Sequence, residues 1–305
     1  MIPVLAILGL FALLLAGAAA AAVLDRLAYA LAAGRPLSGE AAAPFRAAAA
    51  QLARQRIATE RPDAVGAALA PAAYLALAAI GMSVVPLAEG VAVVEIETGI
   101  VLWGACEALT IVVVFLHGWS ANAPLPLIGA YRYVAIGLPA MLLSMFVLIG
   151  VALPAQSLSV IEVVRAQEDV WNVVRQPLGL VLFLMLGLTL SLRGPFDYAD
   201  PADLAGGTSA DASGPAYAVW RLARLCMLVS VSAMASAAFL GGPLGPWLPG
   251  PLWLALKMLV VLAILIAAGR LLARTPPARM LTLIWVVLLP LAFLQLAIAG
   301  VGALP

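Results

Sequence analysis

Eight long apolar stretches constrain this chain more than any other feature of its sequence. They lie at about residues 2–24, 66–87, 99–118, 134–155, 177–192, 218–241, 251–270 and 281–301. A helix needs about 20 apolar residues to cross the hydrocarbon layer of a bilayer. The stretches are rich in Leu, Ala and Val and lack the alternation that is typical of barrel strands. The sequence therefore predicts an all-α, polytopic membrane protein with about eight transmembrane helices, in which residues 1–305 form a single membrane domain.

The composition excludes a soluble protein and several kinds of functional site. Of 305 residues, 65% are hydrophobic and only 10% are charged, whereas soluble domains carry about 25% charged residues. The formal net charge of +1 provides no overall positive field for nucleic acid. Cys106 and Cys226 lie far apart, which excludes a disulfide framework and a zinc or iron–sulfur site built from clustered thiolates. We therefore expect no metal site, no cofactor held by this chain alone, and catalysis that is completed by partner chains.

Positive charges gather on alternate sides of the predicted helices. One side carries Arg26, Arg35, Arg46, Arg54, Arg56, Arg61, Arg132, Arg193, Arg221, Arg224, Arg270, Arg274 and Arg279. The opposite segments carry only Arg165 and Arg175, beside several acidic residues. Because positive charge marks the cytoplasmic side, we expect both termini to face outward from the inner (plasma) membrane. The segments 25–65 and 193–217 then form long cytoplasmic loops.

The first of these loops is predicted to contain a helix of its own. Pro44 suits the first turn of a helix, and we expect that helix to end just before Pro62. Two interpretations stay open, namely a helix that lies at the membrane surface and a platform for a cytoplasmic partner. The loop 193–217 is rich in Asp, Pro and Gly, a composition that predicts no regular structure.

Two charged residues lie inside apolar stretches, where charge is costly. Glu107 is eight residues into its stretch, about 12 Å along a helix. A charged side chain at such a depth costs about 2.5–3.5 kcal/mol. We therefore interpret Glu107 as a proton-handling group that is paired, hydrated or protonated. For Lys257, which lies closer to the end of its stretch, the alternatives are a structural anchor and a role in charge transfer.

Three further polar residues lie near the ends of the apolar stretches. Glu95 precedes the third stretch, where either a solvated outer loop or the start of a proton path accounts for it. Arg132 opens the fourth stretch, where it is either a positively charged anchor or a residue at the mouth of a buried polar path. His117 ends the third stretch, and we interpret it as a polar cap in preference to a metal ligand.

The stretch from Gln176 to Gly214 carries motifs that indicate a family. It reads QPLGLVLFLMLGLTLSLRGPFDYADPADLAGGTSADASG. It resembles membrane-arm subunit 1 (the H subunit of bacterial enzymes) of NADH:quinone oxidoreductase, respiratory complex I, which carries Q-P-L-G-F, R-A-P-F-D-L, an acidic loop and Y-S-G. The matching residues are Arg193, Pro195, Phe196, Asp197, Asp200, Asp203, Asp211, Ser213 and Gly214. Further similar segments are HGWSANAPLPLIGAYR, which includes Arg132, and FLGGPLGPWLPGPLWLALK, which ends at Lys257.

The resemblance implies the heel subunit of the membrane arm of a proton-translocating NADH:quinone oxidoreductase. In that family, cytoplasmic loops help to form a quinone chamber with the peripheral arm, and buried charges couple quinone reduction to proton movement. It implies quinone at an interface with iron–sulfur subunits and other membrane-arm subunits as partners. The implied chamber and coupling-loop residues are Arg35, Arg193, Phe196, Asp197, Asp200, Asp203 and Asp211. The proton-path candidates are Glu107, Arg132, Lys257 and Glu95.

The chain departs from the family pattern at several positions of the expected proton path. Met141 and Leu190 stand where the family has glutamate, and Ile136 stands where it has glutamine. Two alternatives therefore stay open. The first is the membrane anchor subunit of a related membrane-bound hydrogenase or ferredoxin-driven complex. The second, less well supported, is a stand-alone secondary transporter.

Overall fold

The computed structural model describes residues 2–201 and 206–302, and these residues form helices and connecting loops without a β-strand. The elements are α1 (Ile2–Ala32), η1 (Glu40–Ala42), α2 (Ala43–Leu52), α3 (Ala64–Ser83), α4 (Gly99–Ser120), α5 (Pro124–Ala152), α6 (Val160–Arg165), α7 (Asn172–Arg175), α8 (Pro177–Leu190), α9 (Gly214–Phe239), α10 (Gly250–Leu271), α11 (Pro277–Leu283), the π-helical turn η2 (Ile284–Leu288) and α12 (Leu289–Gly302). The all-α, polytopic prediction is confirmed.

Seven segments of the described chain are long and apolar enough to cross a membrane. They are α1, α3, α4, α5, α9, α10 and the continuous segment formed by α11, η2 and α12. The eighth stretch, expected at 177–192, is the exception because α8 has only 14 residues and is about 21 Å long. The chain beyond α8 turns into the protein, where Ser191 and Leu192 are buried. A short helix is tolerated at this depth because protein, and not lipid, surrounds its irregular continuation.

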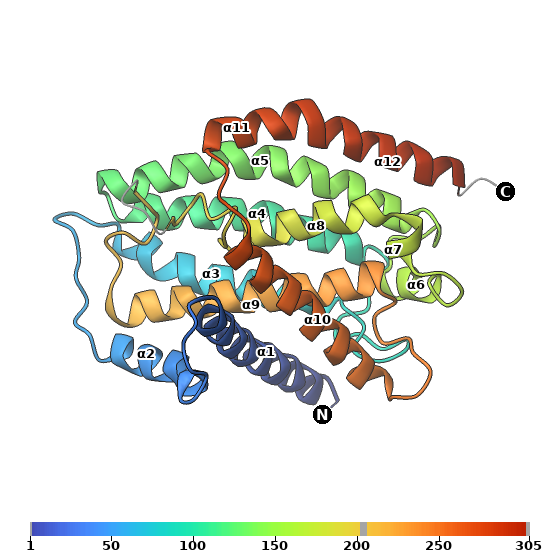
Figure 1. Ribbon diagram of the computed structural model, residues 1–305, viewed down its shortest axis with the longest axis horizontal. Helices are drawn as coiled ribbons and strands as arrows, with labels where there is room; N and C mark the ends of the chain where they lie inside the picture. Colours follow the sequence, from blue (N-terminus) through green and yellow to red (C-terminus); the bar gives the residue numbers. More distant parts are fainter. Residues whose placement is uncertain (1, 202–205, 303–305) are drawn as a thin grey trace.

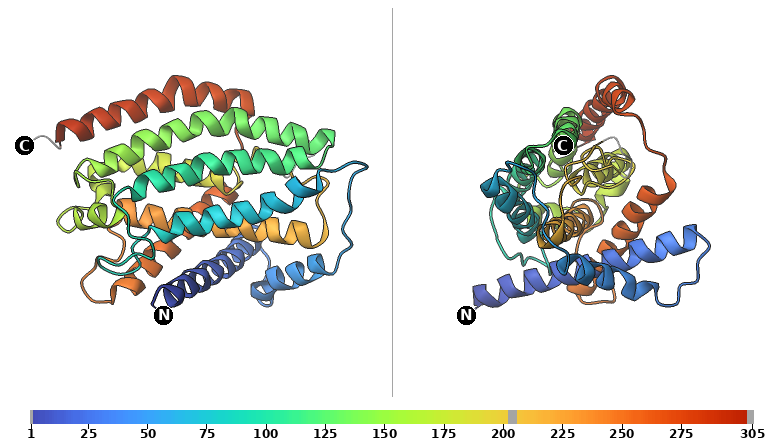
Figure 2. Two further views of the ribbon diagram at one scale, coloured as in Figure 1. Left: turned by 180° about the vertical axis from the view of Figure 1, so that it is seen from behind. Right: turned by 90° about the vertical axis from the view of Figure 1, so that its left-hand side faces the viewer.

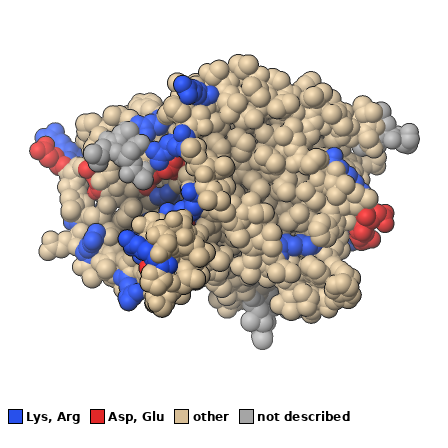
Figure 3. Space-filling model, in the orientation of Figure 1, with Lys and Arg blue, Asp and Glu red and all other residues tan. Residues whose placement is uncertain are grey.

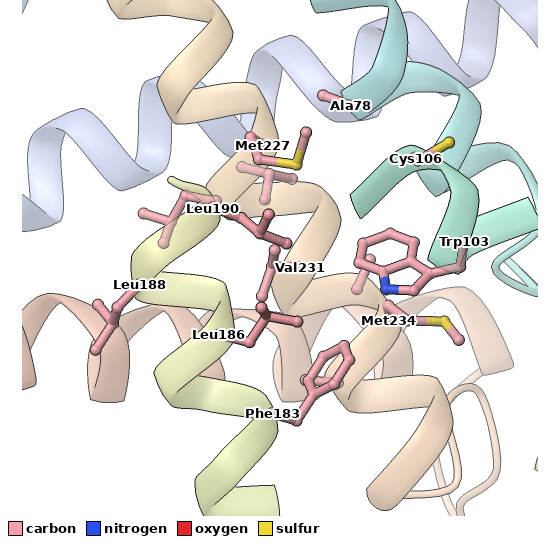
Figure 4. Packing of buried hydrophobic residues seen from close by; sticks show 14 of the residues in the cluster. Ala78, Trp103, Cys106, Phe183, Leu186, Leu188, Leu190, Met227, Val231 and Met234 are labelled. Atoms are coloured by element: carbon pink, nitrogen blue, oxygen red, sulfur yellow. The ribbon is translucent and has the colours of Figure 1, made fainter. Parts of the chain in front are cut away.

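Helix α9 forms the centre of the bundle, with α1, α3, α8 and α10 packed around it. Its buried half is built from small residues such as Ser232, Ala235 and Ser236, which let neighbouring helices approach closely. At the contact with α8, a Cβ atom on Gly187 would overlap Cγ1 of Val231. Figure 4 shows this core, in which side chains of α8, α9 and α4 interlock, among them Phe183, Met234 and Trp103.

The two ends of the bundle differ in their elements and in their charge. The first turns of α1 and the last turns of α12 both point toward the end where α6 and α7 lie, while α1 runs obliquely across the other helices (Figures 1 and 2). Helix α2 and the loop segments 53–63, 191–201 and 206–213 lie at the opposite end (Figure 1). Most Lys and Arg side chains in the space-filling view gather at that loop-bearing end, and the broad middle of the face carries few charges (Figure 3).

The helix that was expected to run from Pro44 to just before Pro62 is shorter than predicted, because α2 ends at Leu52. The backbone from Gln55 to Asp63 forms no regular structure and bonds to other segments. The amide of Ile57 donates to Oγ of Ser213 at 2.7 Å, and the amide of Asp63 donates to the carbonyl of Ser120 at 2.8 Å. The segment 25–65 also begins as helix, since α1 continues to Ala32.

Candidate functional site

Four arginines and three aspartates surround a cavity of about 530 Å³ at the loop-bearing end of the bundle. We call it the charged cavity. Its charged lining residues are Asp25, Arg193, Asp197, Asp200, Arg224, Arg270 and Arg274. Tyr217 adds a phenol to the same wall. Since arginine outnumbers aspartate by one, the cavity offers hydrogen-bond donors and a small excess of positive charge.

Each aspartate of the charged cavity is paired with arginine. Asp197 accepts two hydrogen bonds from Arg274, from Nε at 2.8 Å and from Nη2 at 2.5 Å. Asp200 accepts from Nη1 of Arg224 at 2.8 Å. These paired groups are held in fixed positions because charge-assisted hydrogen bonds are short and directional.

Asp25 joins two arginines that come from distant parts of the chain. Its carboxylate lies 3.2 Å from Nη2 of Arg193 and 3.0 Å from Nη2 of Arg270. The long α1 carries Asp25, the loop after α8 carries Arg193, and the end of α10 carries Arg270. The charged cavity is therefore assembled only when three segments of the chain meet.

A close approach of backbone positions the loop that carries Asp197 and Asp200. A Cβ atom on Gly129 of α5 would lie 2.6 Å from the carbonyl oxygen of Ala199 and 2.7 Å from the amide of Thr208. Only glycine fits at this contact. The loop and α5 are thereby packed backbone to backbone. A second contact holds the start of the same loop, where Nη2 of Arg224 donates to the carbonyl of Leu192.

Burial changes the proton affinity of two groups at this site. It lowers the pKa of the Arg193 guanidinium from its usual value, while the nearby Asp25 carboxylate raises it. Burial, together with the Asp197 carboxylate, raises the pKa of Tyr198 to about 12. The Tyr198 hydroxyl therefore stays protonated at neutral pH, and it donates to the carbonyl of Thr275 at 2.9 Å.

A second cavity, of about 750 Å³, shares Asp25, Arg193, Tyr217, Arg224 and Arg270 with the first. A groove of about 270 Å³ lies beside it, between α1, α2 and α9. The groove is mostly apolar and is lined by Leu15, Ala18, Ala19, Ala22, Pro44, Phe45, Ala48, Gln51, Ala218, Arg221, Leu222 and Leu225. Ala22 and Leu225 line both spaces, so the apolar groove lies directly beside the second cavity.

The residues predicted for the quinone chamber are only partly brought together. Arg193, Asp197 and Asp200 line the charged cavity. Phe196 is buried beside them, with its ring centroid 6.4 Å from that of Tyr198.

The other predicted chamber residues lie elsewhere. Arg35 is exposed, with its guanidinium 5.6 Å from the centroid of the Tyr29 ring, and Asp211 lines a separate small cavity. Asp203 lies outside the described residues.

Sequence reasoning missed the other half of the charged cavity, namely Asp25, Tyr217, Arg224, Arg270 and Arg274. In the sequence, these arginines mark only the cytoplasmic side. One signal was available, because most of them lie at helix ends on the same predicted side as the R-x-P-F-D segment. Nothing in the sequence pairs a particular arginine with a particular aspartate.

Glu107 is buried between α4 and α5 and its carboxylate is fully engaged. Its Oε1 accepts from Nε1 of Trp103 at 2.6 Å, and its Oε2 accepts from Oγ of Ser144 at 2.5 Å. Its side chain forms no ion pair with any cation of the described chain. Glu107 is therefore an acid that neutral donors hold in an apolar interior, with 2% of its surface exposed.

Lys257 lies in a cage at the end of the bundle that faces away from the charged cavity. Its Nζ donates to the carbonyls of Gly242 at 2.9 Å and Leu244 at 2.7 Å. The same ammonium lies 4.5 Å from the ring centroid of Trp171 and 5.5 Å from that of Trp253. This geometry favours the anchoring interpretation of Lys257 over charge transfer.

The remaining two proton-path candidates lie apart from Glu107. Glu95 is exposed on a cavity that also contains Glu97 and Glu162. Arg132 is half-buried near the start of α5. Among the bonds of the described residues, none joins Glu95, Glu107 and Lys257 into one network.

The cage predicts the effect of changing Lys257. Lys257→Met should lower the midpoint of thermal unfolding of the assembled protein, because leaving a buried carbonyl unpaired costs about 1–3 kcal/mol. Lys257→Arg should keep most of the stability, since a guanidinium donates to both carbonyls and lies against indole rings. Thermal unfolding of the purified complex measures both. Equal stability of the methionine variant and the wild type would contradict the anchoring role.

Comparison with known proteins gives consistent matches along nearly the whole chain. A family model described as NADH dehydrogenase matches residues 2–300. The NADH-quinone oxidoreductase H subunit 1 of Rhodopseudomonas palustris (strain BisA53) is 36% identical over 239 residues, which cover 78% of this chain and 75% of that protein. The H subunit 2 of the enzyme from Rhizobium meliloti (strain 1021) is 32% identical over 245 residues, covering 76% and 75%. The corresponding H subunit from Granulibacter bethesdensis is 30% identical over 240 residues, covering 76% and 70%.

Proposed function

Because the chain belongs to the NADH dehydrogenase family, with relatives named as the H subunit of NADH-quinone oxidoreductase, we propose that it is the membrane subunit that forms part of the quinone chamber of such an enzyme. In this proposal it couples quinone reduction to proton movement, and partner subunits supply the electrons through iron–sulfur clusters. The names of the relatives favour this function over the hydrogenase-type anchor and over the stand-alone transporter.

The observation that carries the proposal is a polar cavity that adjoins an apolar groove. A quinone has a flat ring with two carbonyl oxygens, which accept hydrogen bonds, and a long apolar tail. Arg193, Arg224 and Tyr217 provide donors on the cavity wall that suit carbonyl oxygens. The cavity volumes of about 530 and 750 Å³ are typical of small-molecule sites.

The apolar groove suits the tail and connects the cavity to the membrane. Leu15 and Phe45 are exposed large hydrophobic residues on its walls. In the proposed orientation, both termini face outward and the charged cavity lies at the cytoplasmic end, where the positive charges gather. A tail that lies in lipid can then pass between α1, α2 and α9 while the ring reaches the arginines.

Glu107 is the group that we propose for proton handling inside the membrane part. Quinone reduction consumes two electrons and two protons per molecule, so the charge near Asp197 and Asp200 becomes more negative until the protons have followed the electrons. Carboxyl groups in apolar surroundings respond to such a change by binding or releasing protons. Glu107 is suited to this role because uncharged donors hold it in place.

Blocking the junction between cavity and groove tests the proposal. Ala22→Trp should raise the KM for a long-tailed quinone about tenfold or more, because an indole fills the passage. A tenfold increase corresponds to a loss of about 1.4 kcal/mol. A short-tailed quinone should be affected much less. Ala16→Trp on the exposed face of α1 is the matched control. Steady-state quinone reduction by the assembled complex measures each case, and equal KM values for all three proteins would refute the proposed passage.

A further inference from the structure

His117 is the single histidine of the chain, and it is buried. Neither Nδ1 nor Nε2 has a partner among the described residues. A neutral imidazole carries one N–H donor and one acceptor nitrogen, and leaving each unmet in a dry interior costs about 1–3 kcal/mol. Buried polar atoms are ordinarily satisfied by protein or by ordered water. We therefore expect ordered water to bond to at least one of the two ring nitrogens.

A cavity of about 70 Å³ lies against His117 and is large enough to hold water. It lies between the loop 56–62, the end of α4 and the segment 208–216. Thr208 lines the same cavity, and its buried Oγ1 likewise has no partner among the described residues. Exposed Arg56 and Asp211 lie on the cavity wall, which connects it to the surface of the loop-bearing end. We call this space the inlet.

One short loop segment links a residue of the inlet to a residue of the charged cavity. Thr208 lines the inlet, and the next residue, Ser209, donates from Oγ to Asp200 at 2.8 Å. Asp200 in turn lines the charged cavity and pairs with Arg224. Asp200 and Arg224 are also the charged groups whose fields reach the His117 ring. The segment that links inlet and cavity thus carries two hydroxyl groups and bonds to a carboxylate.

The plane of the His117 ring is fixed by a contact that does not use its nitrogens. The ring stacks on Trp220 of α9, with centroids 3.7 Å apart and planes 16° apart. Trp220 is fully buried and packs against Tyr74, at 5.0 Å between centroids. Stacking of this kind holds an imidazole in place without using its donor or acceptor.

We propose that His117 is a proton-transfer residue that supplies protons for quinone reduction. It accepts a proton from water in the inlet and passes one, through water and the Thr208 and Ser209 hydroxyls, to the Asp200 carboxylate at the charged cavity. The imidazole is neutral before and after each transfer. Two such protons, with two electrons from the partner subunits, balance the conversion of quinone to quinol. This inference rests on the proposed function.

The sharpest test keeps the stacked ring and removes its nitrogens. In the complete complex, His117→Phe should retain assembly and thermal stability, because phenylalanine also stacks on Trp220. Quinone reduction should fall about a hundredfold, in line with the loss of a positioned proton-transfer group. Thr208→Val, which removes one hydroxyl without changing the shape, should lower the rate severalfold. Thr110→Val is the matched control, because the Thr110 hydroxyl donates to the carbonyl of Cys106 within its own helix, α4.

Chemical rescue separates proton transfer from packing. Adding imidazole to the His117→Ala complex should restore much of the rate, whereas pyrazole, which has the same size but is a far weaker base, should not. Full activity of the phenylalanine variant, or equal rescue by pyrazole, would overturn the inference while leaving the proposed function intact. A wild-type complex that does not reduce quinone would instead overturn the proposed function and the inference with it.

Discussion

Replacing Asp197 with asparagine should lower quinone reduction by the assembled complex about tenfold or more. The Asp197 carboxylate accepts both hydrogen bonds of a forked contact with Arg274. Asparagine keeps one acceptor oxygen but loses the charge and the second acceptor. Hydrogen bonds to charged groups contribute about 1.5–3 kcal/mol each, and a tenfold change in rate requires only about 1.4 kcal/mol. The loss of one such bond is therefore large enough to disturb the wall of the charged cavity.

A double-mutant cycle shows whether this loss arises from the ion pair. Asp197→Asn, Arg274→Ala and the combined variant should have similar turnover, because two partners in one contact are not additive. Asp169→Asn, at an exposed acid that does not line the charged cavity, is the control for a general effect of charge. Native gels of the purified complex separate lost assembly from lost turnover. Unchanged turnover and pumping in the asparagine variant would remove this loop from the mechanism.

The sequence predicts the membrane-spanning helices well because hydropathy is a local property. The apolar stretches around Glu107 and Lys257 are helical as expected, since a bilayer stabilises any apolar helix that is long enough to cross it. The length of α8 was not predictable in the same way. Its stretch is apolar to Leu192, but the chain leaves the helix at Leu190 to enter the protein interior. Hydropathy does not distinguish burial in protein from burial in lipid.

The candidate site was predictable only where a local motif marks it. Arg193 and Asp197 belong to one short segment, so the resemblance finds them together. Asp25 and Arg270 are 245 positions apart, and their contact depends on how α1 and α10 pack. The prediction that α2 ends just before Pro62 is wrong for a similar reason, because the backbone near Ile57 bonds to Ser213. Long-range partners decide each of these features, and a single sequence does not show them.

The second large effect is expected at Glu107, where proton handling and structural support can be separated. Glu107→Gln should leave assembly and unfolding temperature close to those of the wild type. A glutamine oxygen still accepts from Trp103, and its amide can bond to Ser144. However, an amide does not take up a proton in the relevant pH range. If Glu107 handles protons, the number of protons pumped per quinone reduced should fall strongly, with reconstituted vesicles and a pH-sensitive dye as the measurement.

Glu107→Leu provides the contrast that isolates the chemistry. Leucine leaves Nε1 of Trp103 and Oγ of Ser144 without their partner in an apolar interior, at a cost of about 1–3 kcal/mol each. It should therefore lower both stability and pumping, whereas glutamine should lower pumping alone. Ser144→Ala removes one donor but keeps the acid, so it should pump nearly normally. If pumping persists in the glutamine variant, Glu107 is a structural polar residue, and the proton path must run through other groups such as those at the charged cavity.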